Sequence, residues 1–348
     1  MWELANRTPF AAERGWVRDR DGAEVWLVAV KATFDIKPGG TTAISADQPP
    51  VLRVPQYHDG PAGSVKYDVD LVLTKPTTDV LVVGHACAPE GQLVTQMDVG
   101  VRVGELTKVL RVFGDRRWGS FGASAPEAFA KLPIVYERSF GGVDPRSKRP
   151  DRDWDWRNPI GVGFCVAGAH ADGMKLPNIE YPGELIGSWK DRPSPAGFGA
   201  VSSHWQPRAA LAGTYGEEWE KTRKPLLAQD LDDLFFQCAP SDQQTRSFLH
   251  GGEQIVVHGM NPSGSLHFLL PRIHLGFETT FADGSRELHH KRSLHTVVIE
   301  PDVPRVSCVW HSSLRCHSRV QKLTRTIVRL KADAGLGEPA LRDGRSGS

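Results

Sequence analysis

Residues 151–155 (DRDWD) place three aspartates at alternate positions, the spacing of the first ligands in a calcium-binding loop. Such a loop needs a glycine at its sixth position and a bidentate glutamate at its twelfth, where this chain has Trp156 and Val162. The pattern therefore predicts no calcium site. We expect these carboxylates to accept hydrogen bonds from backbone amides or to pair with Arg152 and Arg157.

Histidine and cysteine are the next candidates for metal binding. Nine of the thirteen histidines follow residue 249, but their spacing is irregular, and the adjacent His289 and His290 would point to opposite sides of a strand. The five cysteines are scattered and form no CxxC pair, which is typical of reduced thiols in a cytosol. The sequence predicts neither a bound metal nor another cofactor.

Groups for acid–base or nucleophilic catalysis are also poorly arranged. Ser124 lacks the second glycine of a GxSxG turn and has no strand before it. Adjacent acids such as Asp232 and Asp233 diverge on a helix or a strand, so they are typical of solvated charges. Since no catalytic constellation is present, the sequence predicts that the protein is not an enzyme.

Charge and hydropathy narrow the classes of partner. The 348 residues include 42 Lys and Arg against 41 Asp and Glu, so no overall field attracts nucleic acid or an anionic membrane, and neither partner is expected. No stretch approaches 18 consecutive apolar residues, and the N-terminus has no apolar core of a signal peptide. The expected location is the cytoplasm.

The elements that would position these residues are strands, since apolar residues alternate or run together in short segments. The expected strands are residues 24–36, 66–74, 79–86, 95–103, 105–113, 253–258, 265–270, 273–278, 295–300 and 305–311. They predict a mainly β protein of two sheet-rich lobes, sandwich-like or curled, with long ordered loops and a few short helices. The expected divisions are an N-terminal β lobe at 1–150, a loop-rich segment plus C-terminal β lobe at 151–331, and a flexible tail at 332–348.

Two short helices are indicated by capping boxes. Thr214 precedes Glu217 by three residues, and Ser241 precedes Gln244 by the same spacing. In each box the hydroxyl would accept a hydrogen bond from a first-turn amide. The sequence therefore predicts helices that start at Thr214 and Ser241.

Aromatic residues and arginines in the loops are the remaining functional candidates. The tryptophans at 154, 156, 189 and 205 lie among Gly, Pro and Arg, which suits either a loop anchored in a core or a binding surface. The hypothesis of a partner-binding surface names nine residues: Trp154, Trp156, Arg157, Trp205, Arg208, Tyr215, Trp219, Phe235 and Phe236. Of these, Trp205 and Arg208 are the predicted hot spots.

Several separated blocks carry a resemblance to known sequences: NRTPFAAERGWVRDRDGAEVWLVAVKATFDI, YERSFGG with WRNPIGVGF, KLPNIEYP, PAGFGAVSSHWQPRAALAGTYGEEW, and DLDDLFFQCAPSDQQ with LHGGEQIVVHGMNPSG. In this order the blocks resemble a family of bacterial proteins encoded in type VI secretion clusters. The resemblance implies an adaptor or chaperone that binds an effector and helps to load it, with its PAAR tip, onto the VgrG spike. It implies partners but no catalytic residues.

Two other functions stay open at this point. One is a hydrolase whose histidine and carboxylate groups come together only in the fold, which a deep polar cleft would favour. The other is a structural component of the secretion apparatus, which self-assembly would reveal.

Overall fold

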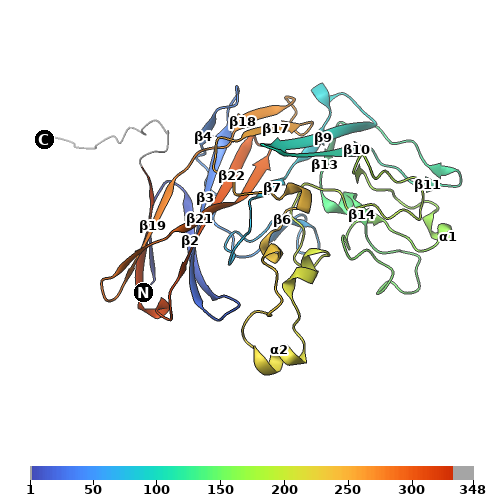
Figure 1. The fold of residues 1–348 in the computed structure, drawn as a ribbon. Helices are drawn as coiled ribbons and strands as arrows, with labels where there is room; N and C mark the ends of the chain where they lie inside the picture. Colours follow the sequence, from blue (N-terminus) through green and yellow to red (C-terminus); the bar gives the residue numbers. More distant parts are fainter. Residues whose placement is uncertain (1, 332–348) are drawn as a thin grey trace.

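Three sheets built from distant parts of the chain surround the main apolar core in the computed structural model, which describes residues 2–331 (Figure 1). The six-stranded sheet has the order β2 (Ala11–Arg18), β3 (Glu24–Ile36), β22 (Arg305–Arg315), β21 (Lys291–Glu300) and β7 (Asp79–Val82), with β4 (Thr42–Ile44) paired to β3. The five-stranded sheet has the order β16 (Ile179–Glu180), β10 (Leu106–Phe113), β9 (Gln96–Val103), β17 (Gln254–His258) and β18 (Leu266–Leu269). The four-stranded sheet has the order β1 (Glu3–Arg7), β23 (Leu323–Leu330), β19 (Leu275–Phe281) and β20 (Arg286–Leu288).

The remaining elements are short. Two-stranded pairs join β5 (Gln56–Tyr57) with β6 (Val65–Tyr67), β8 (His85–Cys87) with β13 (Lys131–Pro133), β11 (Trp118–Gly119) with β12 (Gly122–Ala123), and β14 (Phe140–Gly141) with β15 (Val162–Gly163). The helices are α1 (Gly168–Ala171), α2 (Glu217–Thr222), and the 3-10 turns η1 (Pro89–Gly91), η2 (Tyr136–Arg138), η3 (Arg208–Ala212), η4 (Asp233–Phe236), η5 (Ser241–Gln243) and η6 (Val320–Lys322). None of the helices within residues 2–331 is long and apolar enough to cross a lipid bilayer.

Alternation along β3 explains how the layers pack. Trp26, Val28 and Val30 point into the main core, where they join Val99 and Val101 from β9 in the five-stranded sheet. Two sheets with apolar inner faces form a sandwich. The predicted mainly β fold with several sheets and a few short helices is confirmed.

All three large sheets combine strands from before and after residue 150. Strand β3 pairs with β22 from Asp35 opposite Arg305 to Val25 opposite Arg315, and β9 pairs with β17. The two ends of the described chain also meet, because β1 runs parallel to β23. The division near residue 150 therefore crosses every large sheet, and the expected tail at 332–348 lies outside the described residues.

The strand expected at residues 66–74 is wrong beyond Tyr67, where β6 ends. The polar alternates of this segment do not face solvent as a half-covered strand requires. Asp68 accepts a hydrogen bond from the Arg208 guanidinium at 2.6 Å, and Asp70 accepts one from the Lys31 ammonium at 3.0 Å. These internal ion pairs hold the segment against the protein in an irregular path.

Both predicted capping boxes are also wrong. Helix α2 has Gly216 at its N-cap, and Thr214 instead donates its hydroxyl to the Asp230 carboxylate at 2.8 Å. At η5 the N-cap position is Pro240, and the Ser241 side chain caps nothing. The spacing of a capping box was present, but a nearby carboxylate offered the Thr214 hydroxyl a charged acceptor.

Candidate partner-binding surface

Two loop segments that contain candidate binding residues, 154–164 and 205–236, contact each other in the structure. The backbone N–H of Gln206 donates to the carbonyl of Trp156 at 2.9 Å, which joins residues 154–164 to residues 205–236. Trp156 stacks on Trp154 with ring centroids 4.3 Å apart, and 58% of Trp156 is exposed. The stacked pair therefore presents a rigid aromatic ledge beside Gln206.

The two predicted hot spots lie beneath this surface. Trp205 is 7% exposed and packs edge-on against Tyr136 with ring centroids 5.5 Å apart. Arg208 is 8% exposed; it donates to the carbonyls of Phe235 and Val201 as well as to Asp68. Both side chains support the loops from below, so their alanine variants would disturb the fold as well as any contact with a partner.

A cavity of about 500 Å³ opens beside these loops, and Arg157 and Arg208 both line it. Its apolar wall combines three prolines with aliphatic side chains, namely Pro195, Pro207, Pro240, Val201, Leu211 and Leu234. Leu234 is 40% exposed. Glu184 and Asp242 add carboxylates to the lining. The volume is typical of sites that hold a small molecule or a few side chains.

Lys108 on β10 holds the base of the cavity in place. Its ammonium donates to the carbonyl of Gly197 at 2.7 Å, to the Asp242 carboxylate at 2.8 Å and to the Gln243 side chain at 2.9 Å. Burial lowers the pKa of Lys108 to about 8, against the attraction of Asp242. Because all three ammonium protons have acceptors, Lys108 ties the η5 segment to the five-stranded sheet.

Tyr181 completes this base. Its hydroxyl donates to the second oxygen of Asp242 at 3.0 Å. Burial, followed by the negative charge of Asp242, raises the pKa of the Tyr181 hydroxyl, so it stays a neutral donor at physiological pH. Asp242 thus has one oxygen on an ammonium and the other on a phenol.

Residues 213–231 form an arm that projects from the body and carries α2 at its end (Figure 1). Tyr215 packs edge-on against Trp219 with ring centroids 4.9 Å apart, and the Trp219 indole donates to the carbonyl of Leu226. At the base of the arm, Phe235 packs against Phe236. The nine candidate binding residues therefore lie in different parts of this surface. Some form the exposed ledge, some are buried beneath the loops, some line the cavity, and the rest lie on the arm or at its base.

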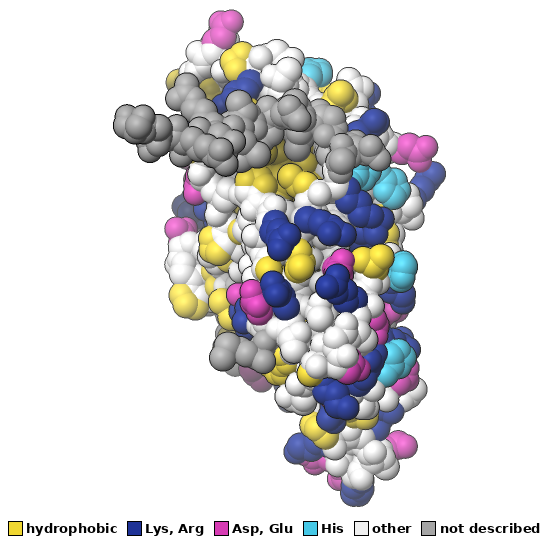
Figure 2. All heavy atoms as spheres, turned by 90° about the vertical axis from the view of Figure 1, so that its left-hand side faces the viewer, with side chains coloured by type: hydrophobic (Ala, Val, Ile, Leu, Met, Phe, Trp, Pro, Cys, Tyr) yellow, Lys and Arg dark blue, Asp and Glu magenta, His cyan; other side chains and the backbone are white. Residues whose placement is uncertain are grey.

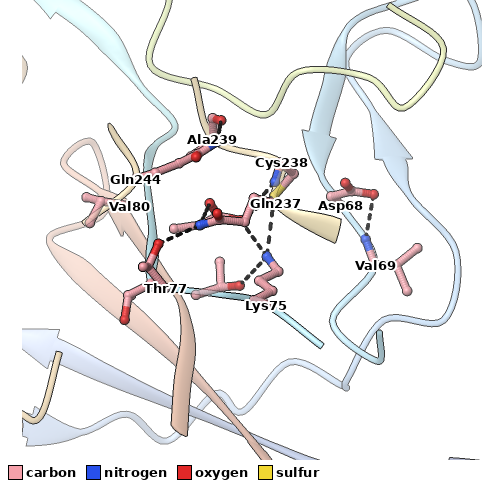
Figure 3. Close-up of polar contacts among 12 residues, drawn as sticks. Asp68, Val69, Lys75, Thr77, Val80, Gln237, Cys238, Ala239 and Gln244 are labelled. Carbon is pink, nitrogen blue, oxygen red and sulfur yellow. Dashed lines mark hydrogen bonds and ion pairs between the residues drawn. The ribbon is translucent and has the colours of Figure 1, made fainter. Parts of the chain in front are cut away.

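A buried polar cluster behind the cavity was not predicted from the sequence (Figure 3). The Lys75 ammonium donates to the Asp79 carboxylate at 2.6 Å and to the Thr296 hydroxyl at 2.9 Å. Asp79 also accepts from the backbone N–H of Cys238 at 2.8 Å, and the Gln237 amide donates to it at 3.3 Å. The cluster fixes residues 237–239, of which Gln237 and Ala239 line the cavity.

The charged state of this cluster follows from its contacts. Burial works against the Lys75 ammonium, but the adjacent Asp79 carboxylate outweighs it and raises the pKa of Lys75. Burial raises the pKa of the Cys238 thiol, so Cys238 is not a thiolate nucleophile at neutral pH. This arrangement is suited to holding loops in position.

The aspartates and histidines considered as metal ligands make contacts within the protein. Asp155 accepts hydrogen bonds from the backbone and guanidinium of Arg157, as expected for the aspartate run. Within residues 2–331, no three His, Cys, Asp or Glu side chains gather as a metal site would require. His295 and His311 stack with ring centroids 4.6 Å apart, and burial lowers the pKa of both.

Lysine and arginine side chains gather on another face of the molecule, seen from the left of Figure 1 (Figure 2). The four-stranded sheet lies on this side, and three of its four arginines lie within ion-pair distance of acids. Arg325 lies 3.4 Å from Glu3, and Arg329 lies 3.6 Å from Glu278. This pairing reduces the positive field of that face.

Comparison with known proteins assigns the chain to a family. A family model described as an uncharacterized protein conserved in bacteria, DUF2169, matches residues 21–311. The chain belongs to this family. No curated protein and no solved structure matches it. The DUF2169 match covers β3, most of the core, the ledge, the cavity and the arm, whereas β1, β2 and β23 lie outside it.

Proposed function

We propose that this DUF2169 protein is a non-catalytic adaptor or chaperone in the bacterial cytoplasm. It binds a type VI secretion effector, together with its PAAR tip, and promotes loading onto the VgrG spike. The proposal starts from the resemblance of the separated sequence blocks. The observation that supports it most directly is the ledge of Trp154 and Trp156, which is held beside the cavity by the contact between Trp156 and Gln206.

The surface has the properties that a binding module needs. Exposed aromatic side chains provide large contact areas with few rotatable bonds, and binding energy concentrates in such anchors. The buried supports Trp205, Arg208 and Lys108 hold the surrounding loops before a partner arrives, which lowers the entropy cost of association. The arm adds a second aromatic pair at Tyr215 and Trp219.

Co-purification with the products of neighbouring genes tests this function. We expect the full chain to form a specific complex with an effector or a PAAR protein. Trp156→Ala should weaken it by about 2 kcal/mol if the ledge is an anchor. Phe121→Ala is the matched control, because Phe121 is an exposed aromatic at the turn between β11 and β12.

The cellular counterpart is secretion of the effector. Cells that lack the protein should retain the effector, and the Trp156→Ala variant should restore secretion less well than Phe121→Ala. The proposal fails if a folded chain binds none of the neighbouring products, or if the deletion strain secretes the effector normally.

A further inference from the structure

The charges that line the 500 Å³ cavity are unequally compensated. Arg157 is paired with Asp155 at 2.6 Å, Arg208 with Asp68 at 2.6 Å, and Asp242 with Lys108 at 2.8 Å. Each of these charges already has an opposite charge in contact with it.

Glu184 is the exception. It is exposed, and one of its carboxylate oxygens accepts a hydrogen bond from the backbone N–H of Ser194 at 2.7 Å. Among the described residues, no Lys, Arg or His lies within ion-pair distance of it, although it is close enough to Arg157 to raise the pKa of that side chain further. The four charged side chains of the lining sum to zero, but when the partners Asp155, Asp68 and Lys108 are counted with them, the negative charge of Glu184 is the one left without a contacting opposite charge.

The apolar part of the lining is stiff. Three prolines restrict the backbone at positions 195, 207 and 240, and Leu234, which also lines the cavity, is 40% exposed. A few side chains fill such a volume, whereas a folded domain does not enter it.

We infer that this cavity receives an extended segment of the partner protein in which a lysine or arginine lies next to an aliphatic or aromatic residue. The cation of that segment pairs with Glu184, and the apolar residue packs on Leu234 and the prolines. The inference rests on the proposed function for the identity of the partner, but the chemistry of the segment follows from the cavity.

An acidic segment fits less well. The two arginines of the lining already have carboxylate partners, and Arg208 is held by two backbone carbonyls as well. An incoming carboxylate would have to displace these partners and would be repelled by Glu184. Opposite charge at one site and repulsion of the wrong charge together give selectivity.

A random 12-residue peptide library displayed on phage, selected on the immobilised full chain, tests the inference. The enriched peptides should contain Lys or Arg within two positions of Leu, Ile, Phe or Met. The most enriched peptide is then synthesised with a fluorescein label, and its dissociation constant is measured by anisotropy at about 50 and about 500 mM NaCl, where salt screening differs strongly.

Two variants and one control separate the contributions. Glu184→Gln keeps the acceptor for Ser194 but removes the charge, and should weaken the peptide about fivefold at low salt and hardly at high salt. Leu234→Ser should weaken it to a similar extent, about fivefold, at both salt concentrations. Glu105→Gln is the control, since Glu105 is also an exposed acid and lies away from the cavity lining, near Arg246 in the β9–β10 turn.

The inference is overturned if no peptide is enriched, if the enriched peptides are acidic, or if both variants bind the labelled peptide as the parent chain does. These outcomes are distinct from failure of the proposed function. An effector complex that Glu184→Gln and Leu234→Ser leave unchanged contradicts the cavity inference alone. Peptide binding as predicted, without any complex with neighbouring gene products, contradicts the proposed function alone.

Discussion

The two faces of the six-stranded sheet are covered by different chemistry. One face packs on the main core through apolar residues such as Val30 and Ile299. Among the described residues, the other face has only small apolar clusters, and it carries Lys31, Asp79 and Glu300, one each on β3, β7 and β21, which all bind side chains of residues 67–75. The contacts are Lys31 with Asp70, Asp79 with Lys75, and Glu300 with the hydroxyl of Tyr67.

This difference bears on how the candidate binding surface is built. Apolar contacts are not directional, so they stabilise a layer without specifying which residue lies where. Ion pairs and hydrogen bonds are directional, and a buried charge that loses its partner is costly. The polar face therefore sets the positions of residues 67–75 and 237–239, and through them the position of Arg208 and the cavity wall.

Removing an ion pair from the polar face should lower the stability of the protein most. Lys75→Met removes the cation from an Asp79 carboxylate that is 0% exposed, so the free energy of unfolding should fall by about 3–5 kcal/mol. Urea unfolding followed by tryptophan fluorescence measures the loss. The double variant Lys75→Met with Asp79→Asn should recover part of it, since the remaining side chain is neutral. A loss below about 1 kcal/mol would show that the pair does not hold this face together.

The second largest effect on stability is expected when the pH is lowered, and it acts on the same face of the sheet through His311. Burial, with a smaller effect of Lys75, lowers the pKa of His311 from 6.5 to about 3. The unfolded chain therefore takes up this proton first as pH falls. The stability contributed by neutral His311 is complete above about pH 6.5 and is lost progressively toward pH 3, on the order of 3 kcal/mol by pH 4.

His295 stacks on His311 and contributes in the same direction. Thermal unfolding between pH 4 and pH 8 tests this dependence. His311→Phe should flatten the acid side of the profile, while the exposed His267→Asn should leave it as it is. An unchanged slope in His311→Phe would mean that other groups control the acid loss.

The same contrast explains which parts of the fold could be predicted from the sequence. Where a run of apolar residues is long and continuous, the sequence predicted the strand, and the one expected at residues 24–36 coincides with β3. Pairing over long distances, such as β1 with β23, leaves no local pattern in either segment. The edge strand β2 was missed, because its residues are all partly exposed and its charges interrupt the alternation.

Predictions from the local sequence pattern were wrong where polar side chains point into the protein. Residues 66–74 had the period of a half-covered strand, but Asp68 and Asp70 find cations inside the protein. For the candidate binding surface, aromatic and arginine residues were named from the sequence, but not the buried residues that hold these loops, Lys75, Lys108 and Gln243. A lone lysine in a strand looks the same in the sequence whether its ammonium reaches solvent or an internal carboxylate.

A substitution on the apolar face should lower the stability less than these changes on the polar face. Ile299→Val removes one methylene from a residue that is 0% exposed, which should cost about 1 kcal/mol. Since neighbouring side chains can relax around so small a space, the pH profile should keep its shape. Urea unfolding at pH 7 and pH 5 checks both points, and a loss that doubles at pH 5 would link the two faces.

The smallest effect on stability is expected where the two ends of the arm meet, at Thr214 and Asp230. We call this the neck of the arm, and it lies outside both faces of the sheet. Thr214→Ala removes a hydrogen bond from the hydroxyl to Asp230 but no helix cap, because Gly216 occupies the N-cap of α2. The global melting temperature should therefore change by less than about 2 °C, as for other exposed positions. The arm itself should open more often, so trypsin should cut faster after Lys221 and after Arg223.

Comparison with Gly213→Ala sharpens this last prediction. Gly213 has φ +84°, and a Cβ there would lie 2.7 Å from the Cβ of Ala228, so alanine must push the two sides of the neck apart. Trypsin cleavage should rise more in Gly213→Ala than in Thr214→Ala, with both chains folded by circular dichroism. If Thr214→Ala instead lowers the melting temperature while cleavage of the arm stays at the parent rate, then Thr214 stabilises the body of the protein and the neck is not an independent hinge.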